Sequence, residues 1–176
     1  QVHALAYSDK EELKGKYVET SRQNFLSTLD ISTYSFTRIS KSASKIMSNG
    51  GSLLTLTYVG SNKTTPNYNV MGVAKAALET SVKYLSVDLG KNNIRVNAIS
   101  AGPMKTIAGA AISGARHVYR YSEKIAPLQK NPDLEQVGNA ALYLLSDISS
   151  GVTGLTHYVD GGLKVVGIPN QDMVNI

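Results

Sequence analysis

The sequence contains no cysteine among its 176 residues. This absence excludes disulfides, thiolate catalysis and cysteine-built zinc sites, and it fits a reducing compartment. No apolar run approaches the roughly 20 residues that a membrane helix needs, and no charged-then-apolar signal peptide opens the chain. We therefore expect a cytoplasmic protein with no membrane segment. We also predict no metal site, because the histidines are too scattered along the chain: His3, His117 and His157.

Clusters of basic residues are scarce as well. The formal net charge is +5, but the lysines and arginines are spread out, with no basic helix and no zinc-finger spacing. We therefore expect no nucleic-acid partner. Residues 104–130 have a local excess of positive charge. This segment contains one acidic residue, Glu123, and five basic ones: Lys105, Arg116, Arg120, Lys124 and Lys130. An acidic partner could dock on this segment, or the segment could be an ordinary solvated surface.

The composition and the length predict one globular domain over residues 1–176. Hydrophobic residues make up 42% of the chain and charged residues 18%, which is ordinary for a folded protein. Apolar runs and 3.6-residue periodicity predict an alternation of strands and helices. The strands are expected at residues 1–7, 52–57, 94–99 and 156–159, and the helices at 21–47, 67–89 and 133–145. The charged loop 8–19 is expected to stay outside any core.

Strands that alternate with helices predict an α/β fold with a Rossmann-like, doubly wound parallel sheet. Ligands of such sheets bind beyond the carboxyl ends of the strands. Tyr7–Ser8, Tyr58 and residues 102–106 each follow a predicted strand, so we expect them to meet at one crevice. Residues 104–130 lack a regular pattern, although parts of them could be helical, and we interpret them as a substrate-binding lid.

Tyr68 and Lys75 form a candidate proton-donor pair. Seven residues advance a helix by two turns, so both side chains are expected on one face of the helix predicted over 67–89. A phenol with an ordinary pKa near ~10 donates a proton reluctantly at neutral pH, and a nearby ammonium eases this by stabilising phenolate. The pair follows an apolar strand and Tyr58, which places it at the mouth of the sheet and indicates a reductase.

Several segments, in this order along the chain, carry a family resemblance: residues 2–7, 66–72, 94–103, 153–154 and 157–162. Six residues separate Tyr68 from Lys75, and Tyr58 stands upstream of them. An ordinary short-chain dehydrogenase has three residues in that interval and a serine upstream. The chain therefore resembles the enoyl-[acyl-carrier-protein] reductases of bacterial type II fatty-acid synthesis, a branch of the short-chain dehydrogenase/reductases, over essentially its whole length.

The resemblance implies reduction of a trans-2-enoyl thioester on acyl carrier protein by NADH, the last step of fatty-acid elongation. Tyr68 would hydrogen-bond the thioester oxygen as it becomes negative, and Lys75 would bind the nicotinamide ribose. Tyr58 would orient the enoyl group, and Ser8 would lie near the substrate. The other residues that the resemblance places against the cofactor are Leu5, Met104, Thr106, Ile107 and Ala108. A homotetramer is implied through the two long helices and the C-terminal strand.

One part of the family pattern is missing from the sequence. No two glycines here occupy the first two positions of the dinucleotide motif G-x-G-x-x-G. The resemblance places that loop, with the first strands, before residue 1, so we expect this chain to be the C-terminal portion of a reductase domain. NADH is chosen over NADPH by resemblance alone. Two alternatives stay open: another short-chain reductase acting on a carbonyl, and a truncated remnant without catalysis.

Overall fold

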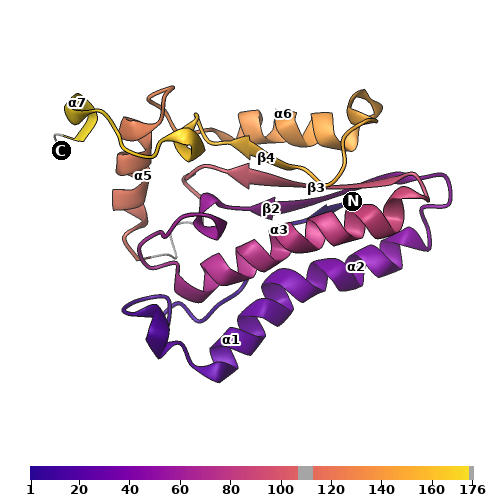
Figure 1. Cartoon of the computed structure of the whole chain (residues 1–176), viewed down its shortest axis with the longest axis horizontal. Coiled ribbons are helices and arrows are strands. Elements are labelled where there is room, and N and C mark those ends of the chain that lie inside the picture. Colours follow the sequence, from indigo (N-terminus) through magenta and orange to yellow (C-terminus); the bar gives the residue numbers. More distant parts are fainter. Residues whose placement is uncertain (107–112, 175–176) are drawn as a thin grey trace.

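Four parallel strands form one sheet in the order β1-β2-β3-β4 (Figure 1). The structure is a computed structural model, and it describes residues 1–106 and 113–174. The strands are β1 (Val2–His3), β2 (Gly51–Thr57), β3 (Ile94–Ala101) and β4 (Thr156–Val159). Because all of them are parallel, their carboxyl ends meet at one edge, at the end of the molecule where helix α5 (Ala115–Ile125) lies.

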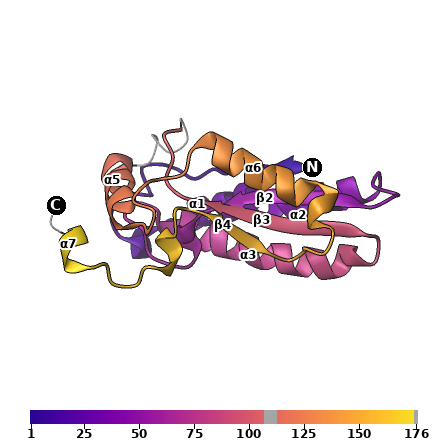
Figure 2. The ribbon, with the colours of Figure 1, turned by 90° about the horizontal axis from the view of Figure 1, so that it is seen from above.

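Helices cover both faces of this sheet (Figures 1 and 2). One face carries α1 (Arg22–Leu29), the π-helical turn η2 (Asp30–Tyr34), α2 (Ser35–Ser44) and α3 (Asn69–Gly90), and the other face carries α6 (Leu134–Leu145). The predicted doubly wound α/β fold is therefore confirmed. The remaining short elements among the described residues are η1 (Tyr17–Glu19), η3 (Val59–Ser61), η4 (Asp147–Ser149), η5 (Leu163–Val165) and α7 (Gln171–Val174).

Two apolar clusters hold the helices to the sheet. The side chains beneath α2 and α3 that are fully buried include Leu53, Leu78, Val82 and Val96. On the opposite face, α6 buries Leu144 against Leu54 and Ile99. Strand residues alternate between these two clusters because successive strand side chains point to opposite faces. Burial on both faces explains why these strands contain almost continuous apolar runs.

The strand predicted at residues 1–7 is shorter than expected. Only Val2 and His3 pair with β2, opposite Leu54 and Thr55. Farther on, the backbone of Tyr7 bonds to a helix instead: its N–H donates to Ser32 Oγ, and its carbonyl accepts from the same hydroxyl. The chain therefore leaves the sheet at its carboxyl edge and continues over η2.

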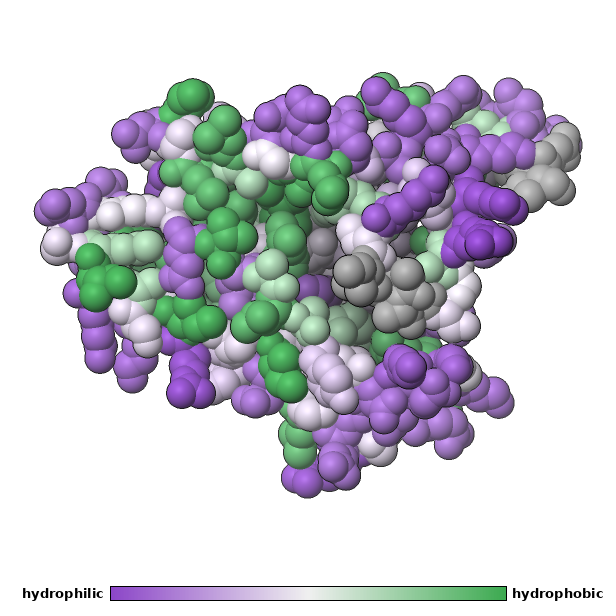
Figure 3. Space-filling view, turned by 180° about the vertical axis from the view of Figure 1, so that it is seen from behind, coloured by the Kyte–Doolittle hydropathy of each residue, from purple (hydrophilic) through white to green (hydrophobic). Residues whose placement is uncertain are grey.

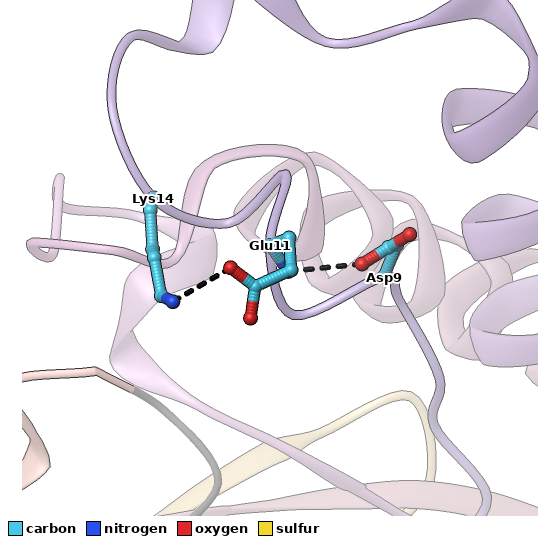
Figure 4. A network of polar contacts seen from close by, with 3 residues as sticks. All are labelled: Asp9, Glu11 and Lys14. Carbon is cyan, nitrogen blue, oxygen red and sulfur yellow. Dashed lines mark hydrogen bonds and ion pairs between the residues drawn. The ribbon is translucent and has the colours of Figure 1, made fainter.

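The loop of residues 8–19 was expected to stay outside any core, and this expectation is wrong in one respect. Its charged residues do remain at the surface, where Lys14 pairs with Glu11 at 2.7 Å and the Glu11 N–H donates to Asp9 Oδ1 (Figure 4). Leu13, however, is buried in a cluster with Tyr68, Val70, Met71 and Ala74. One apolar side chain is enough to dock an otherwise polar loop onto the site.

Helix ends follow the expected chemistry at two positions. Ser21 caps α1 by accepting from the Asn24 N–H, and Asp133 forms a capping box with Gln136 at the start of α6. The long helix predicted over 21–47 is interrupted, because residues 30–34 adopt a π-helical turn between α1 and α2. In the described part of the chain, no helix combines the length and apolarity needed to cross a membrane.

Hydrophobic side chains also gather on the face behind the view of Figure 1 (Figure 3). Strand β1 is the edge strand on this side, and its neighbourhood leaves Val2, Leu5 and Tyr7 about half exposed. Leu134 and Leu142 on α6 are exposed as well. Exposed apolar side chains that gather on one face are common where a protein makes contacts.

Candidate active site

Tyr58 and Tyr68 are in direct contact. Tyr58 follows the last residue of β2 in an extended conformation, and Tyr68 is the N-cap residue of α3. Their rings meet edge-on, with centroids 5.2 Å apart and an angle of 67° between the planes. This arrangement is one of the preferred geometries of aromatic pairs. The structure therefore brings together the two tyrosines that the sequence selected.

Two glycines make room for the buried Tyr68 ring, of which 6% is exposed. A Cβ on Gly60 would lie 2.6 Å from Cδ1 of Tyr68, and a Cβ on Gly72 would lie 2.7 Å from the carbonyl oxygen of Gly60. Both distances are far below van der Waals contact. The turn η3, the start of α3 and the phenol ring can therefore pack together only because neither glycine has a side chain.

The backbone on either side of Tyr68 is left-handed. Asn67 has a φ of 57° and Asn69 a φ of 34°, a region where asparagine is among the few tolerated residues. The Asn67 amide donates to the Ser113 carbonyl at 2.8 Å, and the Asn69 amide donates to the carbonyls of Glu12 and Gly15. The helix predicted from residue 67 consequently begins at residue 69, and Tyr68 is presented from its cap.

Lys75 lies beneath the end of β2. Its side chain is buried, with 8% exposed, and Nζ donates to the carbonyl oxygen of Leu56 at 2.9 Å. Burial lowers the pKa of the ammonium from 10.5 to about 8, and the charge of Glu79 partly opposes this shift. An ammonium has three N–H donors, so the bond to Leu56 leaves donors for a ligand.

The electrostatics of Tyr68 differ from the sequence prediction. Burial raises the pKa of the phenol above its ordinary value of 10, and the neighbouring Tyr58 and Glu79 raise it further. The expected stabilisation of phenolate by Lys75 is therefore wrong for this site. At neutral pH Tyr68 is a neutral hydrogen-bond donor, which suits an oxygen that becomes negative during a reaction.

His3 is a second buried titratable group near Lys75. Its two ring nitrogens contact Thr55 Oγ1 at 3.1 Å and Ser35 Oγ at 2.8 Å. Burial lowers the pKa of the imidazole, and the charge of Lys75 lowers it further. The ring is thus held neutral between β2 and α2, in the structural role predicted for it.

Two pockets open beside the tyrosine pair. Tyr58 lines a pocket of about 400 Å³ whose other walls include Val118, Tyr121, Ile125 and Leu163. Tyr68 lines a separate pocket of about 460 Å³ together with Tyr17, Gly60 and Gly72. Tyr68 therefore borders an opening, although it is a buried residue. A larger pocket of about 760 Å³ lies along β4 and contains none of the predicted site residues.

The remaining predicted residues lie at the same edge of the sheet. Leu5 and Ser8 follow β1, while Met104 and Thr106 follow β3, with the Thr106 N–H donating to the Met104 carbonyl. The Ser8 hydroxyl is engaged internally, because it bonds to Asn24 and accepts from Thr28 Oγ1 at 2.9 Å. Ile107 and Ala108 lie outside the described residues.

Several residues that shape the site were not selected from the sequence. Gly60 and Leu13 belong to segments whose pattern gives no sign that they touch Tyr68. Asn67 and Asn69 could have been found, because asparagine on both sides of one residue favours left-handed backbone. Their effect is to fix the direction in which Tyr68 leaves the main chain.

The fold and the site define a class. The sheet is parallel and covered on both faces, and the helix after a central strand carries a tyrosine on its cap and a lysine in its first turns. This is the arrangement of the short-chain dehydrogenase/reductases. A family model described as enoyl-(acyl carrier protein) reductase matches residues 1–164. The chain belongs to this family.

Individual relatives agree with this assignment. The chain is 58% identical to "Enoyl-[acyl-carrier-protein] reductase [NADH] 1" of Rhizobium meliloti over 175 residues, which are 99% of this chain and 64% of the relative. Among solved structures, the enoyl-(acyl-carrier-protein) reductase of Anaplasma phagocytophilum in complex with NAD has a TM-score of 0.92 at 57% identity, over 96% of this chain and 64% of that one. FabI from Candidatus Liberibacter asiaticus has a TM-score of 0.94 at 53% identity, over 96% and 66%. The chain thus spans just under two thirds of the relatives it matches.

Proposed function

We propose that the protein reduces trans-2-enoyl-[acyl carrier protein] to acyl-[acyl carrier protein] with NADH, the last step of the fatty-acid elongation cycle. The observation that carries this proposal is the contact of Tyr58 with Tyr68 above a helix that holds the buried Lys75. The family to which the chain belongs supports the same reaction. Relatives named as NADH-dependent enoyl reductases support the choice of cofactor.

Tyr68 acts on the thioester oxygen in this proposal. When a hydride reaches the β-carbon of the enoyl group, the oxygen becomes an enolate and needs a hydrogen-bond donor. Tyr68 is neutral because its pKa is raised by burial, and its ring borders a pocket. A neutral donor in a poorly solvated site stabilises developing negative charge strongly. Tyr58 holds the ring of Tyr68 and lines the space for the enoyl group.

Lys75 fits the nicotinamide end of a dinucleotide. It is a buried cation with donors beyond its bond to Leu56, and it lies at the edge where Leu5, Met104 and Thr106 follow their strands. Bound NADH would supply the hydride. Lys75 would hold the ribose hydroxyls and keep a positive charge near the enolate oxygen. The residues proposed to contact the cofactor, besides Lys75, are Leu5, Met104, Thr106, Ile107 and Ala108.

The pocket beside Tyr58 suits the acyl chain. Its walls are mostly apolar and include Val59, Val118 and Ile125, and α5 forms one of its sides. We propose that residues 104–130 act as the lid of this pocket; among its described residues, those of α5 line the pocket. Closing such a lid excludes water and strengthens the hydrogen bond to the substrate oxygen.

The carrier protein is proposed to dock on α5. Arg116 and Arg120 lie one helical turn apart on this helix and are exposed, and they surround a shallow pocket together with Lys124. A basic surface at the mouth of the acyl pocket complements an acidic carrier. In this proposal the basic residues of segment 104–130 attract the carrier protein to the entrance of the acyl pocket.

A homotetramer is proposed for the assembly. On α3, Tyr84 is 72% and Val87 79% exposed, and both belong to one face of the helix. The open side of β4 borders the 760 Å³ pocket, which a second subunit could cover. Apolar surfaces at these two places support contacts through the long helices and the C-terminal strand. The cytoplasmic location expected from the sequence remains a prediction.

The decisive experiment is turnover by the full-length protein, measured as NADH oxidation with crotonyl thioesters. Tyr68→Phe and Lys75→Ala should each lower the rate strongly, and near-wild-type rates in both variants would contradict the mechanism. Turnover of ketones without turnover of crotonyl thioesters would indicate the carbonyl-reducing alternative. A dinucleotide titration beside an intact-mass measurement separates a non-catalytic remnant, which binds no NADH, from an active reductase.

A further inference from the structure

Glu79 lies one helical turn beyond Lys75 on α3, and its carboxylate faces the turn that carries Tyr58. Oε1 accepts hydrogen bonds from Thr57 Oγ1, at 2.8 Å, and from Ser61 Oγ. Oε2 accepts from the Asn62 amide at 3.3 Å. One half-buried carboxylate therefore holds the residue before Tyr58 and the two residues that close the turn after it.

Lys75, on the same helix, binds the carboxyl end of β2. Its ammonium donates to the carbonyl of Leu56, the residue immediately before Thr57. Two side chains of α3 thus hold residues 56–62. The Lys75 ammonium binds Leu56, and the Glu79 carboxylate binds Thr57 at the start of the turn and Ser61 and Asn62 at its end. The spacing of four residues places both side chains on one face of the helix.

The turn held in this way sets the tyrosine pair. Tyr58 is its first residue, and Gly60 lies against the ring of Tyr68 so closely that a Cβ would be 2.6 Å from that ring. The Tyr58 ring contacts the Tyr68 ring edge-on. A shift of residues 57–62 away from α3 would therefore move Tyr58 and open the packing around Tyr68.

We propose that Glu79 is a positioning residue of the active site, which ties the Tyr58 turn to the helix of Lys75 and so fixes the tyrosine pair; this rests on the proposed function. Glu79 does not need to touch substrate or cofactor for this role. It also contributes a negative charge that favours the charged form of Lys75. Position and charge can be separated by substitution.

Glu79→Gln removes the charge and keeps an oxygen that accepts from Thr57 or Ser61. The titratable groups coupled to the Lys75 ammonium in the described part of the chain are Glu79 on α3 and His3 on β1. Because the Glu79 charge raises the pKa of Lys75, its removal should lower that pKa below about 8. In a plot of kcat against pH, the decline on the alkaline side (the alkaline limb) should then move to lower pH, with little change in the KM for the thioester.

The complementary variant is Thr57→Val combined with Ser61→Ala. It keeps the charge and removes two hydrogen bonds to the carboxylate. Since bonds to charged groups are the stronger kind, we expect kcat to fall by roughly 10- to 100-fold, with the alkaline limb unmoved. Asp88→Asn is the matched control, because Asp88 is an exposed carboxylate on the same helix, and this variant should leave both kcat and the limb unchanged.

A purely structural glutamate gives a different pattern. It would lower the melting temperature of Glu79→Gln without moving the alkaline limb, and that result overturns the proposal. Wild-type kcat in the double variant overturns it as well. If Glu79→Gln does not fold, the double variant decides alone. A loss of kcat with an unchanged alkaline limb supports the proposal, and an unchanged kcat overturns it.

Two readouts do not depend on turnover. Amide hydrogen exchange of residues 57–62 should be faster in the double variant than in Asp88→Asn, because the turn has lost its attachment. An NMR titration of Lys75 should give a lower pKa in Glu79→Gln than in the wild type. If wild-type protein fails to reduce enoyl thioesters, the proposed function fails, while these two measurements still test whether Glu79 holds the turn and the charge.

Discussion

The ring of Tyr58 meets the ring of Tyr68 edge-on, with the two centroids 5.2 Å apart. The first tyrosine comes from the end of a strand and the second from the cap of the following helix. Because each ring restricts the other, packing fixes the direction of the Tyr68 phenol. Removing a hydroxyl and removing a ring should therefore have separable effects.

Tyr68→Phe keeps the ring contact and removes the proposed donor to the substrate oxygen. We expect kcat to fall by about 10²–10³, as for the loss of an oxyanion donor elsewhere. Tyr58→Phe should cost much less, because the ring contact with Tyr68 is kept and the Tyr58 hydroxyl is not the proposed donor to the substrate oxygen. Steady-state rates of NADH oxidation with a crotonyl thioester measure both. A larger loss in Tyr58→Phe than in Tyr68→Phe would reverse the assigned roles.

Lys75 should make stability and activity respond oppositely to alkaline pH. Its pKa is lowered from 10.5 to about 8 in the folded protein. Between these values the unfolded chain binds more protons at this group, so this group makes the folded state more stable as pH rises. From about pH 7 to about pH 9.5 the gain is on the order of 1–2 kcal/mol. Activity should instead decline as pH passes about 8, since the ammonium loses its charge.

Urea unfolding of the wild type and of Lys75→Met at the two pH values isolates this contribution. The difference in unfolding free energy between the two proteins should shift in favour of the wild type at the higher pH. The raised pKa of Tyr68 acts with the opposite sign, but only above its ordinary value of 10. A difference that stays constant with pH would show that the Lys75 pKa is not lowered on folding.

Gly72→Ala should damage the site although it places a better helix former in α3. The new Cβ would lie 2.7 Å from the Gly60 carbonyl, so the turn and the helix must separate. Overpacking costs about 1–3 kcal/mol, and a clash with a backbone oxygen belongs to the upper part of that range, above the helix-propensity gain of about 1 kcal/mol. Gly138→Ala in α6 is the matched control, because a Cβ there meets no atom within 4 Å. Denaturant unfolding should show loss in the first variant and a slight gain in the second.

Arg116→Glu with Arg120→Glu should weaken docking of the carrier protein. We expect the KM for a carrier-bound enoyl thioester to rise by about tenfold, because steering by a charged surface changes association rates by that much or more. The KM for a coenzyme A thioester should change little, since that substrate lacks the acidic protein. Lys41→Glu with Lys45→Glu is the control, because it makes the same charge change at the C-terminal end of α2 (Figure 1). Equal effects on both substrates would remove α5 from the docking surface.

The sequence was sufficient for the fold because its strands are buried on both faces. Strands β2, β3 and β4 were predicted correctly, and Asp133 caps α6 as expected. Continuous apolar runs between helical patterns have few other solutions than a parallel sheet. The first strand was predicted too long because an apolar run does not reveal where backbone groups find partners. Beyond His3, those partners include a helix hydroxyl, Ser32 Oγ.

The site was predictable in its residues and less so in its physics. The spacing of Tyr68 and Lys75 identified the pair, yet it suggested that the ammonium would favour phenolate. Burial dominates instead, and it depends on contacts from distant segments, such as Leu13 and Gly60 against Tyr68. Glu79 was also missed, because a glutamate on a helix is ordinarily a surface residue. Its hydrogen-bond partners lie in a turn 17 to 22 residues earlier in the chain.

The π-helical turn at residues 30–34 has a consequence for how this protein can vary. Its hydroxyls bind two places at once: Ser32 contacts the backbone of Tyr7, and Thr33 donates to the carbonyl of Ala74 beside Lys75. The extra residue of a π turn rotates everything after it by about 100° relative to an uninterrupted α-helix. Deleting one residue here would straighten the helix but swing Phe36 out of the apolar cluster it now fills. Residue count in this stretch is therefore constrained as tightly as residue identity, and single gaps should be rare among functional variants.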